Sequence, residues 1–225
     1  MGKDYCELVL EQGVVAVPND VLLYDDFEGQ FNWSSYGAGT DWVVGKSSGG
    51  NEMMDGQYGL KLQTRTTTPA AGDYAAAYKS ISVLPQKSLS WRVYFRSSTP
   101  ILIGKVWVYG YYYTGSVQRC YEIYYNVVAK QWYYYGPGGV LSVVPGGNQN
   151  IDLDAWSVLE IEVSLISNVI KSIKCNNMDL KDINLATYNV GSSTPSNFTL
   201  YCQINNQSAG VSKLFLDHML ITGKV

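Results

Sequence analysis

The chain has 225 residues, with 16 Lys and Arg against 19 Asp and Glu, a net charge of -3 and a charged fraction of 16%. This length suits one large domain with its own core, and the evenly spread cations exclude the basic stripe of a typical nucleic-acid-binding protein. Because His218 is the single histidine, metal sites that need two imidazoles are excluded as well.

The start of the chain predicts a short arm ahead of a single body. Residues 1–11 carry acids where a secretory leader has a basic start and an apolar run, and no stretch approaches the roughly 20 apolar residues of a membrane span. We therefore expect a protein made in the cytoplasm that does not insert into a membrane. Residues 1–21 are rich in Leu and Val and predict an N-terminal arm, which either adds a strand to the body, residues 22–225, or docks on a neighbouring subunit.

From residue 58 onward, segments with apolar residues at every second position alternate with turn residues. The predicted strands are 58–66, 75–83, 88–96, 101–113, 118–128, 131–135, 159–165, 169–175, 198–204 and 213–222. No helices alternate with these strands, which argues against a parallel sheet. We predict an all-β fold in which two antiparallel sheets stack as a sandwich.

The four cysteines, Cys6, Cys120, Cys175 and Cys202, form no Cys-x-x-Cys pair, so a metal site or a thioredoxin-like site has no support. We predict buried free thiols. A disulfide between Cys175 and Cys202 is the alternative if the chain is located outside the cell.

Three segments together resemble the concanavalin A-like lectin and glucanase jelly rolls, a group that includes laminin-G-like modules. They are the opening Leu-Tyr-Asp-Asp-Phe-Glu-Gly of residues 23–29 followed by Trp33, the strand of residues 155–163 leading to Asn176-Asn177, and the closing strand 213–222. The resemblance spans residues 23–222 and implies a jelly roll whose last strand returns beside the first. This architecture hosts glycosidases, lectins, adhesins and virion proteins, so it does not settle function.

The resemblance also implies a structural calcium ion between the opening acidic turn and the last strand. The matching positions are Asp25, Asp26 or Glu28 together with Asp217, whose carboxylates are suitable ligands for Ca²⁺. The alternative is that these acids accept hydrogen bonds from amides at the strand ends. No other cofactor is expected.

Catalysis is the third and weakest hypothesis. Glycosidases of this group carry two carboxylates on one strand face, and Glu160 and Glu162 share a face with their backbones about 6.6 Å apart. However, Ile161 stands where the group's pattern has a further acid, and the alternation favours the solvent side of an ordinary strand. Asp217 and His218 are neighbours on a strand and point to opposite faces, which argues against a catalytic triad. We therefore predict that the protein is not an enzyme.

Tyrosine is the most unusual feature of the composition. Residues 107–135 contain ten of the nineteen tyrosines, together with two tryptophans. On a strand, Trp107, Tyr109, Tyr111 and Tyr113 share one face, while Tyr112 points to the other. We expect one of these two faces to line the core and the other to be exposed. The predicted ligand-binding residues are Trp107, Tyr109, Tyr111, Tyr113, Glu122, Tyr124, Asn126, Trp132 and Tyr134.

Such a surface can stack sugar rings or form a protein interface. Our first hypothesis is a non-catalytic recognition or assembly protein on the surface of a phage, virus or other particle, for example in capsid decoration, which oligomerises or docks through its arm. The second is a carbohydrate-binding module that stacks sugars on the Tyr- and Trp-rich face. The predicted partners are therefore protein subunits of a larger assembly or a glycan.

Overall fold

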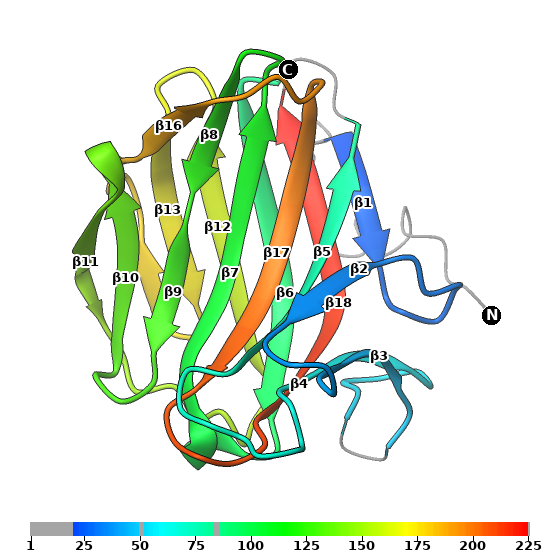
Figure 1. The fold of residues 1–225 in the computed structure, drawn as a ribbon. Helices are drawn as coiled ribbons and strands as arrows, with labels where there is room; N and C mark the ends of the chain where they lie inside the picture. The colour runs from blue at the N-terminus through cyan, green and yellow to red at the C-terminus, as the bar shows by residue number, and fades with distance from the viewer. Residues whose placement is uncertain (1–19, 50–51, 83–85, 225) are drawn as a thin grey trace.

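The computed structural model describes residues 20–49, 52–82 and 86–224, and these residues form two stacked antiparallel β-sheets (Figure 1). Helix in these ranges is confined to two 3-10 turns, η1 (Pro100–Leu102) and η2 (Pro137–Gly139). None of the described residues belongs to a helix long and apolar enough to cross a membrane. The prediction of an all-β, two-sheet sandwich is confirmed.

The first sheet has the strand order β14-β13-β12-β6-β18-β4-β3, with β1 paired to β18 and β15 paired to β13. Its strands are β1 (Asp20–Asp25), β3 (Val43–Ser47), β4 (Gly59–Gln63), β6 (Ser88–Ser97), β12 (Ser157–Ser164), β13 (Val169–Cys175), β14 (Met178–Leu180), β15 (Leu185–Ala186) and β18 (Lys213–Lys224). Tyr24 of β1 lies opposite Leu220 of β18, so the last strand returns beside the first as the resemblance implied.

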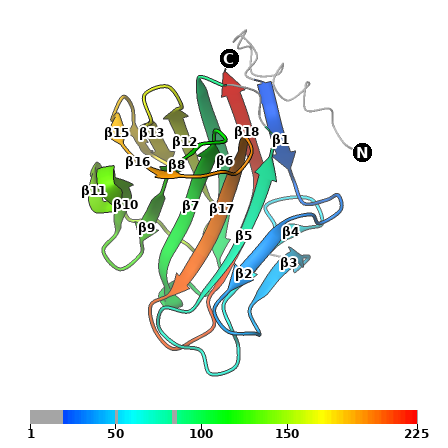
Figure 2. The same ribbon diagram turned by 45° about the horizontal axis from the view of Figure 1, so that its top comes forward.

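The second sheet has the order β11-β10-β9-β7-β17-β5-β2, and β8 pairs with β7 and β16 beside this path. Its strands are β2 (Ser34–Gly37), β5 (Tyr74–Ile81), β7 (Ile103–Tyr113), β8 (Val117–Tyr121), β9 (Ile123–Asn126), β10 (Gln131–Gly136), β11 (Val140–Asn148), β16 (Tyr188–Gly191) and β17 (Asn197–Asn206). Figure 2 shows this sheet in front of the first, with β7, β17 and β5 at its centre.

The strands form because their side chains alternate between the core and the outside. In β6, Leu89, Trp91, Val93 and Phe95 are buried while the residues between them are partly exposed. Burying a side chain at every second position stabilises a strand only when a second layer covers that side. The two sheets supply that cover for each other.

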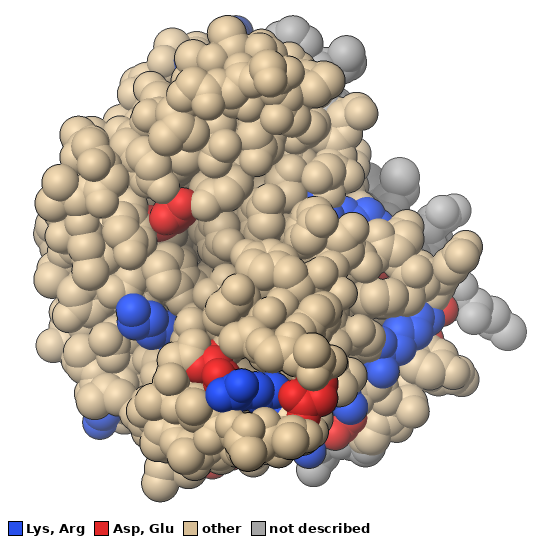
Figure 3. Space-filling model, viewed as in Figure 1, with Lys and Arg blue, Asp and Glu red and all other residues tan. Residues whose placement is uncertain are grey.

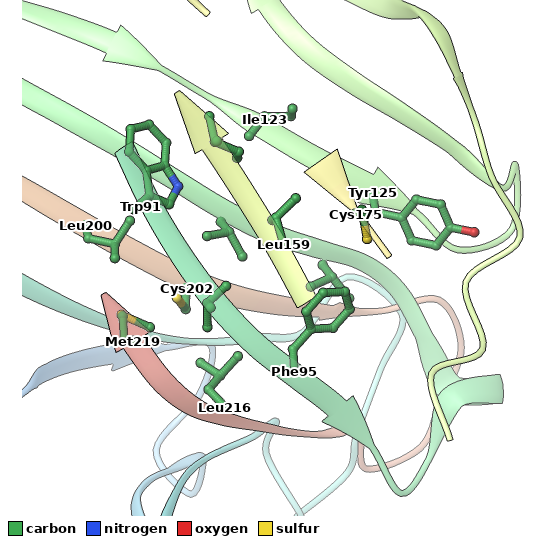
Figure 4. Close-up of a cluster of buried hydrophobic side chains, with 14 of the residues drawn as sticks. Trp91, Phe95, Ile123, Tyr125, Leu159, Cys175, Leu200, Cys202, Leu216 and Met219 are labelled. Atoms are coloured by element: carbon green, nitrogen blue, oxygen red, sulfur yellow. The ribbon is translucent and has the colours of Figure 1, made fainter. Parts of the chain in front are cut away.

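The core lies between the two layers (Figure 4). Trp91 and Phe95 of the first sheet meet Leu200 and Cys202 of the second, and Cys175 lies in the same cluster. Cys120, Cys175 and Cys202 are buried free thiols, as predicted, so the alternative disulfide does not form. Cys6 lies outside the described residues.

The structure differs from the predicted strands in three ways. The predicted strand 118–128 divides at Glu122, because β8 turns away to pair with β16 while β9 pairs with β10. The short strands β2, β3, β14, β15 and β16 and the Gly- and Pro-containing β11 were not predicted. Finally, β1 begins at Asp20, so a described strand reaches into the predicted arm 1–21. Residues 1–19 of that arm lie outside the described residues.

Candidate functional site

The outer side of the second sheet is covered with tyrosines, because the strand registers align them. Tyr109 of β7 lies opposite Tyr201 of β17, which lies opposite Tyr78 of β5, and Trp107 lies opposite Tyr124 of β9. We call this surface the tyrosine face. Its aromatic residues are Tyr36, Tyr74, Tyr78, Trp107, Tyr109, Tyr111, Tyr113, Tyr124, Tyr133, Tyr135, Tyr188 and Tyr201.

The rings of the tyrosine face contact one another in an unbroken series. Tyr201 stacks on Tyr109 with ring centroids 4.8 Å apart and planes 3° apart, and on Tyr78 at 5.3 Å. Trp107 lies 4.2 Å from Tyr124, which stacks on Tyr133 at 5.3 Å. The series crosses from β10 to β2, five inter-strand spacings or roughly 24 Å. It is therefore long enough to contact several units of a linear ligand.

The aromatic residues of the face differ in exposure. The side chains of Tyr124 and Tyr109 are only 2% and 7% exposed, because neighbouring rings cover them. Trp107, Tyr111 and Tyr201 are partly exposed. Figure 3 shows the corresponding side of the molecule with a hollowed surface.

Glu122 lies among these rings and is held by two tyrosines. Its Oε1 atom accepts a hydrogen bond from the Tyr188 hydroxyl at 2.7 Å and another from the Tyr111 hydroxyl. Within the described residues, no group donates a hydrogen bond to its Oε2 atom. One oxygen of this fixed carboxylate is therefore available to a ligand.

A second polar cluster lies farther along β17. Trp107 Nε1 and Gln203 Nε2 both donate to Asn205 Oδ1, each at 2.9 Å, while the Tyr36 hydroxyl donates to Gln203 Oε1 at 3.3 Å. These bonds fix the orientation of the indole ring and of the amide groups. The side chains are thus preorganised, which lowers the entropic cost of binding a ligand.

Charge is scarce on the tyrosine face. Among the described residues on this side, Lys105 is placed by the strand register, and Glu122, between β8 and β9, is placed by its hydrogen bonds to Tyr111 and Tyr188. The Lys105 ammonium lies over the ring of Tyr124, 4.9 Å from its centroid. Figure 3 shows few charged atoms across this side, and most blue and red atoms lie toward its lower and right-hand edges. The centre of the face is polar because of hydroxyl and amide groups.

The tyrosine hydroxyls of this face remain protonated. Burial raises the pKa of Tyr124 to about 12. The pKa of Tyr111 is raised far above its ordinary value, first by burial and then by its hydrogen bond to Glu122. Burial is also the main cause of the raised pKa values of Tyr109, Tyr188 and Tyr201. Near neutral pH these groups are hydrogen-bond donors, and they are poorly suited to act as bases.

Most of the predicted ligand-binding residues lie together. Trp107, Tyr109, Tyr111, Tyr113, Glu122, Tyr124 and Asn126 share the tyrosine face. The Asn126 side chain, however, accepts a hydrogen bond from the Ala129 amide at 3.0 Å and so stabilises the following turn.

Two of the predicted ligand-binding residues, Trp132 and Tyr134, lie on the core side of β10. Trp132 is fully buried in the core, and Tyr134 packs against the core. The register pairs Tyr133 with Tyr124, so the odd-numbered residues of β10 carry the tyrosine face. Tyr133 and Tyr135 therefore replace Trp132 and Tyr134 in the candidate site.

Sequence reasoning missed the part of the face that lies on β17, β5, β2 and β16. Alternation along β17 could have revealed Tyr201, Gln203 and Asn205, because the residues between them are buried. Tyr36 and Tyr188 lie on short strands whose sequences carry little strand signal. Only the pairing of these strands brings them to the face.

The carboxylates proposed for calcium accept hydrogen bonds from the protein itself. Asp25 accepts from the Phe27 amide and from Trp33 Nε1, and Glu28 accepts from two amides of residues 57 and 58. Asp217 accepts from the amides of Met54 and His218, each at 2.8 Å. These contacts correspond to the alternative reading, in which the acids cap strand-end amides. The calcium site itself stays a prediction.

A different group of potential ligand atoms gathers at the last strand. In the described part of the chain, Asp55, Asp217 and His218 form the single group of three such side chains. His218 Nε2 lies 2.8 Å from Asp55, and its Nδ1 lies 2.8 Å from the Tyr24 hydroxyl. Because Ca²⁺ takes oxygen ligands, the imidazole makes this group unlike a calcium site. Its hydrogen bonds join β1, β18 and the loop before β4.

Glu160 and Glu162 lie on the outer side of the first sheet, away from the tyrosine face. Glu160 accepts two hydrogen bonds from Arg92, at 2.9 and 2.7 Å. Glu162 lies 3.9 Å from Lys171 and 4.0 Å from Lys224. This is the solvent side of an ordinary strand, as the sequence favoured.

The sequence matches no protein-family model and no curated protein. Among solved structures, the conserved carbohydrate esterase of the Shiga toxin-encoding bacteriophage phi24B has a TM-score of 0.61, 15% identity, and coverage of 92% of this chain and 100% of that chain. An endo-acting O-glycanase structure from the human gut microbiota has a TM-score of 0.51, 11% identity, and coverage of 91% and 100%. The cellulose induced protein Cip1 has a TM-score of 0.50, 11% identity, and coverage of 90% and 98%. At these identities the likeness concerns the fold alone.

Proposed function

We propose that this concanavalin A-like jelly roll is a non-catalytic protein that binds a carbohydrate chain on its tyrosine face. The observation that carries the proposal is the unbroken series of aromatic rings across the second sheet, with polar groups placed between them. The C–H faces of sugar rings pack on aromatic side chains, while their hydroxyls need donors and acceptors nearby.

The polar groups of the face suit that role. Glu122 offers a free carboxylate oxygen, and the hydroxyl of Tyr111 and the amide of Gln203 are fixed by hydrogen bonds. The solved structures that resemble this chain include proteins described as a carbohydrate esterase and as O-glycanases. Their descriptions support a carbohydrate as the class of ligand.

The chemistry of the face supports binding without catalysis. Glycoside hydrolysis generally uses two carboxyl groups that flank the scissile bond, and the described part of the tyrosine face supplies one, Glu122. A tyrosine base would need a lowered pKa, whereas burial raises the pKa of Tyr109 and Tyr111. Cys120 is also a poor nucleophile, because burial raises its pKa to about 11.

The test is a glycan array followed by titration calorimetry with the best ligand. We expect binding by the intact protein and an affinity loss of at least tenfold in Trp107→Ala and in Tyr201→Ala, about 1.4 kcal/mol each. Tyr94→Ala is the matched control, because Tyr94 lies on the outer side of the first sheet beside His218. If no glycan binds, or if Tyr94→Ala weakens binding as much as the other two, the proposal fails.

A second candidate function is assembly on a virion or another particle. Strand β11 lies at the end of the second sheet and, among the described strands, pairs only with β10. Its Val140, Leu141 and Val143 are exposed and the strand carries no charge. An uncharged apolar edge strand favours pairing with another subunit.

The assembly candidate makes a separate forecast. We expect light scattering to find a dimer or a larger oligomer, and Val143→Lys to dissociate it without unfolding the sandwich. Deletion of residues 1–19 tests whether the predicted arm contributes. A wild-type protein that stays monomeric at high concentration, with no particle association that depends on β11 or on the arm, contradicts this candidate.

A further inference from the structure

We propose that the tyrosine face selects uncharged glycans over acidic ones, and that Glu122 is the residue responsible. This inference rests on the proposed function, because it names the class of carbohydrate that the same face accepts. It goes beyond that function by predicting which polysaccharides the protein rejects.

The hydrogen bonds of Glu122 define the partner that fits it. The hydroxyls of Tyr111 and Tyr188 hold Oε1, and among the described residues Oε2 accepts no bond. A carboxylate accepts hydrogen bonds and donates none, so its natural ligand partner is a sugar hydroxyl. The carboxylate group of a uronate, or a sulfate group, in the same place offers no proton and brings a second negative charge.

The cations near the face do not compensate that charge. The backbone of Lys105 is four residues from Tyr109 along β7, about 13 Å at the rise of a strand, so Lys105 belongs to the end of the face formed by Trp107 and Tyr124. Its ammonium also lies over the rings of Tyr124 and Trp107.

Arg119 is the nearest arginine along the chain, but it is on the other side of the sheet. It lies opposite Tyr112 in the β7–β8 pair, and Tyr112 packs against the core. Sites that bind carboxylates or sulfates normally present Arg or Lys to them. The centre of the tyrosine face instead presents a carboxylate.

The size of the discrimination follows from Coulomb's law. Two like charges about 5 Å apart, with the effective dielectric constant of about 20 that applies near a protein surface, repel strongly enough to lower an affinity by more than tenfold. The aromatic rings contribute equally to both classes of ligand. The ratio of the two affinities therefore reports on Glu122.

The experiment compares matched ligands that differ in charge. The probes are soluble hydroxyethylcellulose, β-1,4-galactan, xylan and mannan, and each polymer with C6 hydroxyls is also used after oxidation of those hydroxyls to carboxylates. We expect at least one neutral polymer with C6 hydroxyls to bind, and its oxidised form to bind at least tenfold more weakly at low salt. Added salt should raise the affinity for the oxidised form and leave that for the neutral form unchanged.

Glu122→Gln isolates the charge, because the amide keeps an acceptor oxygen for Tyr111 and Tyr188. In this variant we expect the ratio of neutral to oxidised affinity to fall at least fivefold. The control is Glu162→Gln, which removes a carboxylate from the outer side of the first sheet and should leave the ratio unchanged.

The outcomes separate the two proposals. If no glycan of either class binds, the proposed function fails and the selectivity fails with it. If a neutral polymer binds and its oxidised form binds as well or better in the wild-type protein, only the selectivity is overturned. A ratio that stays unchanged in folded Glu122→Gln overturns the assignment to Glu122. If this variant does not fold, the salt titration of the wild-type protein still tests whether charge repulsion causes the selectivity.

Discussion

The two outer sides of the sandwich differ in how their side chains are satisfied. On the first sheet, Arg92 pairs with Glu160 at 2.7 Å, and Glu162 lies near Lys171. On the second sheet, Tyr109 stacks on Tyr201 and Glu122 is held by tyrosine hydroxyls rather than by a cation. Both sides belong to antiparallel sheets with the same core, so the backbone does not require the difference.

The difference indicates where the function lies. An antiparallel sheet commonly has a polar, solvated outer side, and the first sheet follows that rule. The second sheet places most of its large aromatic side chains outside the core, where they contribute less to core packing than buried apolar groups would. A surface that departs from the rule in this way is the better candidate for binding.

The largest effect that should distinguish the two sides is a loss of protein stability at alkaline pH, which the tyrosine face causes. The pKa values of Tyr109, Tyr111 and Tyr201 are raised mainly by burial, so folding favours their protonated forms. That contribution to the free energy of unfolding is complete below the unfolded pKa of about 10 and is lost as the pH rises above it. Burial also raises the pKa of the Cys202 thiol. This thiol therefore adds a further loss of unfolding free energy, which begins near the unfolded cysteine pKa of about 8.5.

Urea unfolding at pH 8 and at pH 11 measures this effect. We expect a clear fall in the free energy of unfolding at pH 11, and a smaller fall in Tyr109→Phe, which has one fewer titrating hydroxyl. A stability that is equal at the two pH values would contradict the buried placement of these tyrosines.

The next effect in size is the loss of a stacked ring. Tyr201→Ala removes contacts with Tyr109 and Tyr78, and we expect it to lower the free energy of unfolding by about 3 kcal/mol. Tyr201→Phe keeps the ring and should cost less than about 1.5 kcal/mol. A loss below about 0.5 kcal/mol in Tyr201→Ala would show that the rings do not support one another.

A smaller effect concerns Gly110, which lies between Tyr109 and Tyr111 on β7. A Cβ atom at this position would lie 2.5 Å from the ring of Phe198, so the core needs a glycine here. We expect Gly110→Ala to lower the free energy of unfolding by about 1–3 kcal/mol in denaturant titrations. The control is Gly45→Ala in β3, where a Cβ atom has no neighbour within 4 Å. Equal stabilities of the two variants would argue against the placement of β7.

The smallest effect belongs to the ionic side. Glu160→Gln breaks a partly exposed ion pair with Arg92, and such pairs contribute about 0–1 kcal/mol. We expect an unfolding free energy within about 1 kcal/mol of the wild type and unchanged glycan binding. Loss of glycan binding in this variant would mean that the two sides were assigned the wrong way round.

The fold could be predicted from the sequence because its signal is local. Leu89, Trp91, Val93 and Phe95 recur at every second position, and this pattern alone identifies a half-buried strand. The same pattern placed Trp107, Tyr109, Tyr111 and Tyr113 on one side of β7. Neither inference needed knowledge of the partner strands.

The rest of the candidate site depends on pairing between distant strands. Tyr78 and Tyr201 meet because β5 pairs with β17 across more than a hundred residues of chain. Trp132 and Tyr134 were assigned to the wrong side because both sides of β10 carry aromatic residues, so periodicity could not distinguish them. The register of β10 against β9 decides the matter.

The most direct measurement is a crystal structure of the protein with a neutral oligosaccharide that it binds. We predict electron density for sugar rings across β7 and β17, against Trp107 and Tyr201, with a sugar hydroxyl donating a hydrogen bond to Glu122. Density on the outer side of the first sheet, or at the loops at the ends of the sandwich with the tyrosine face left free, would contradict the account.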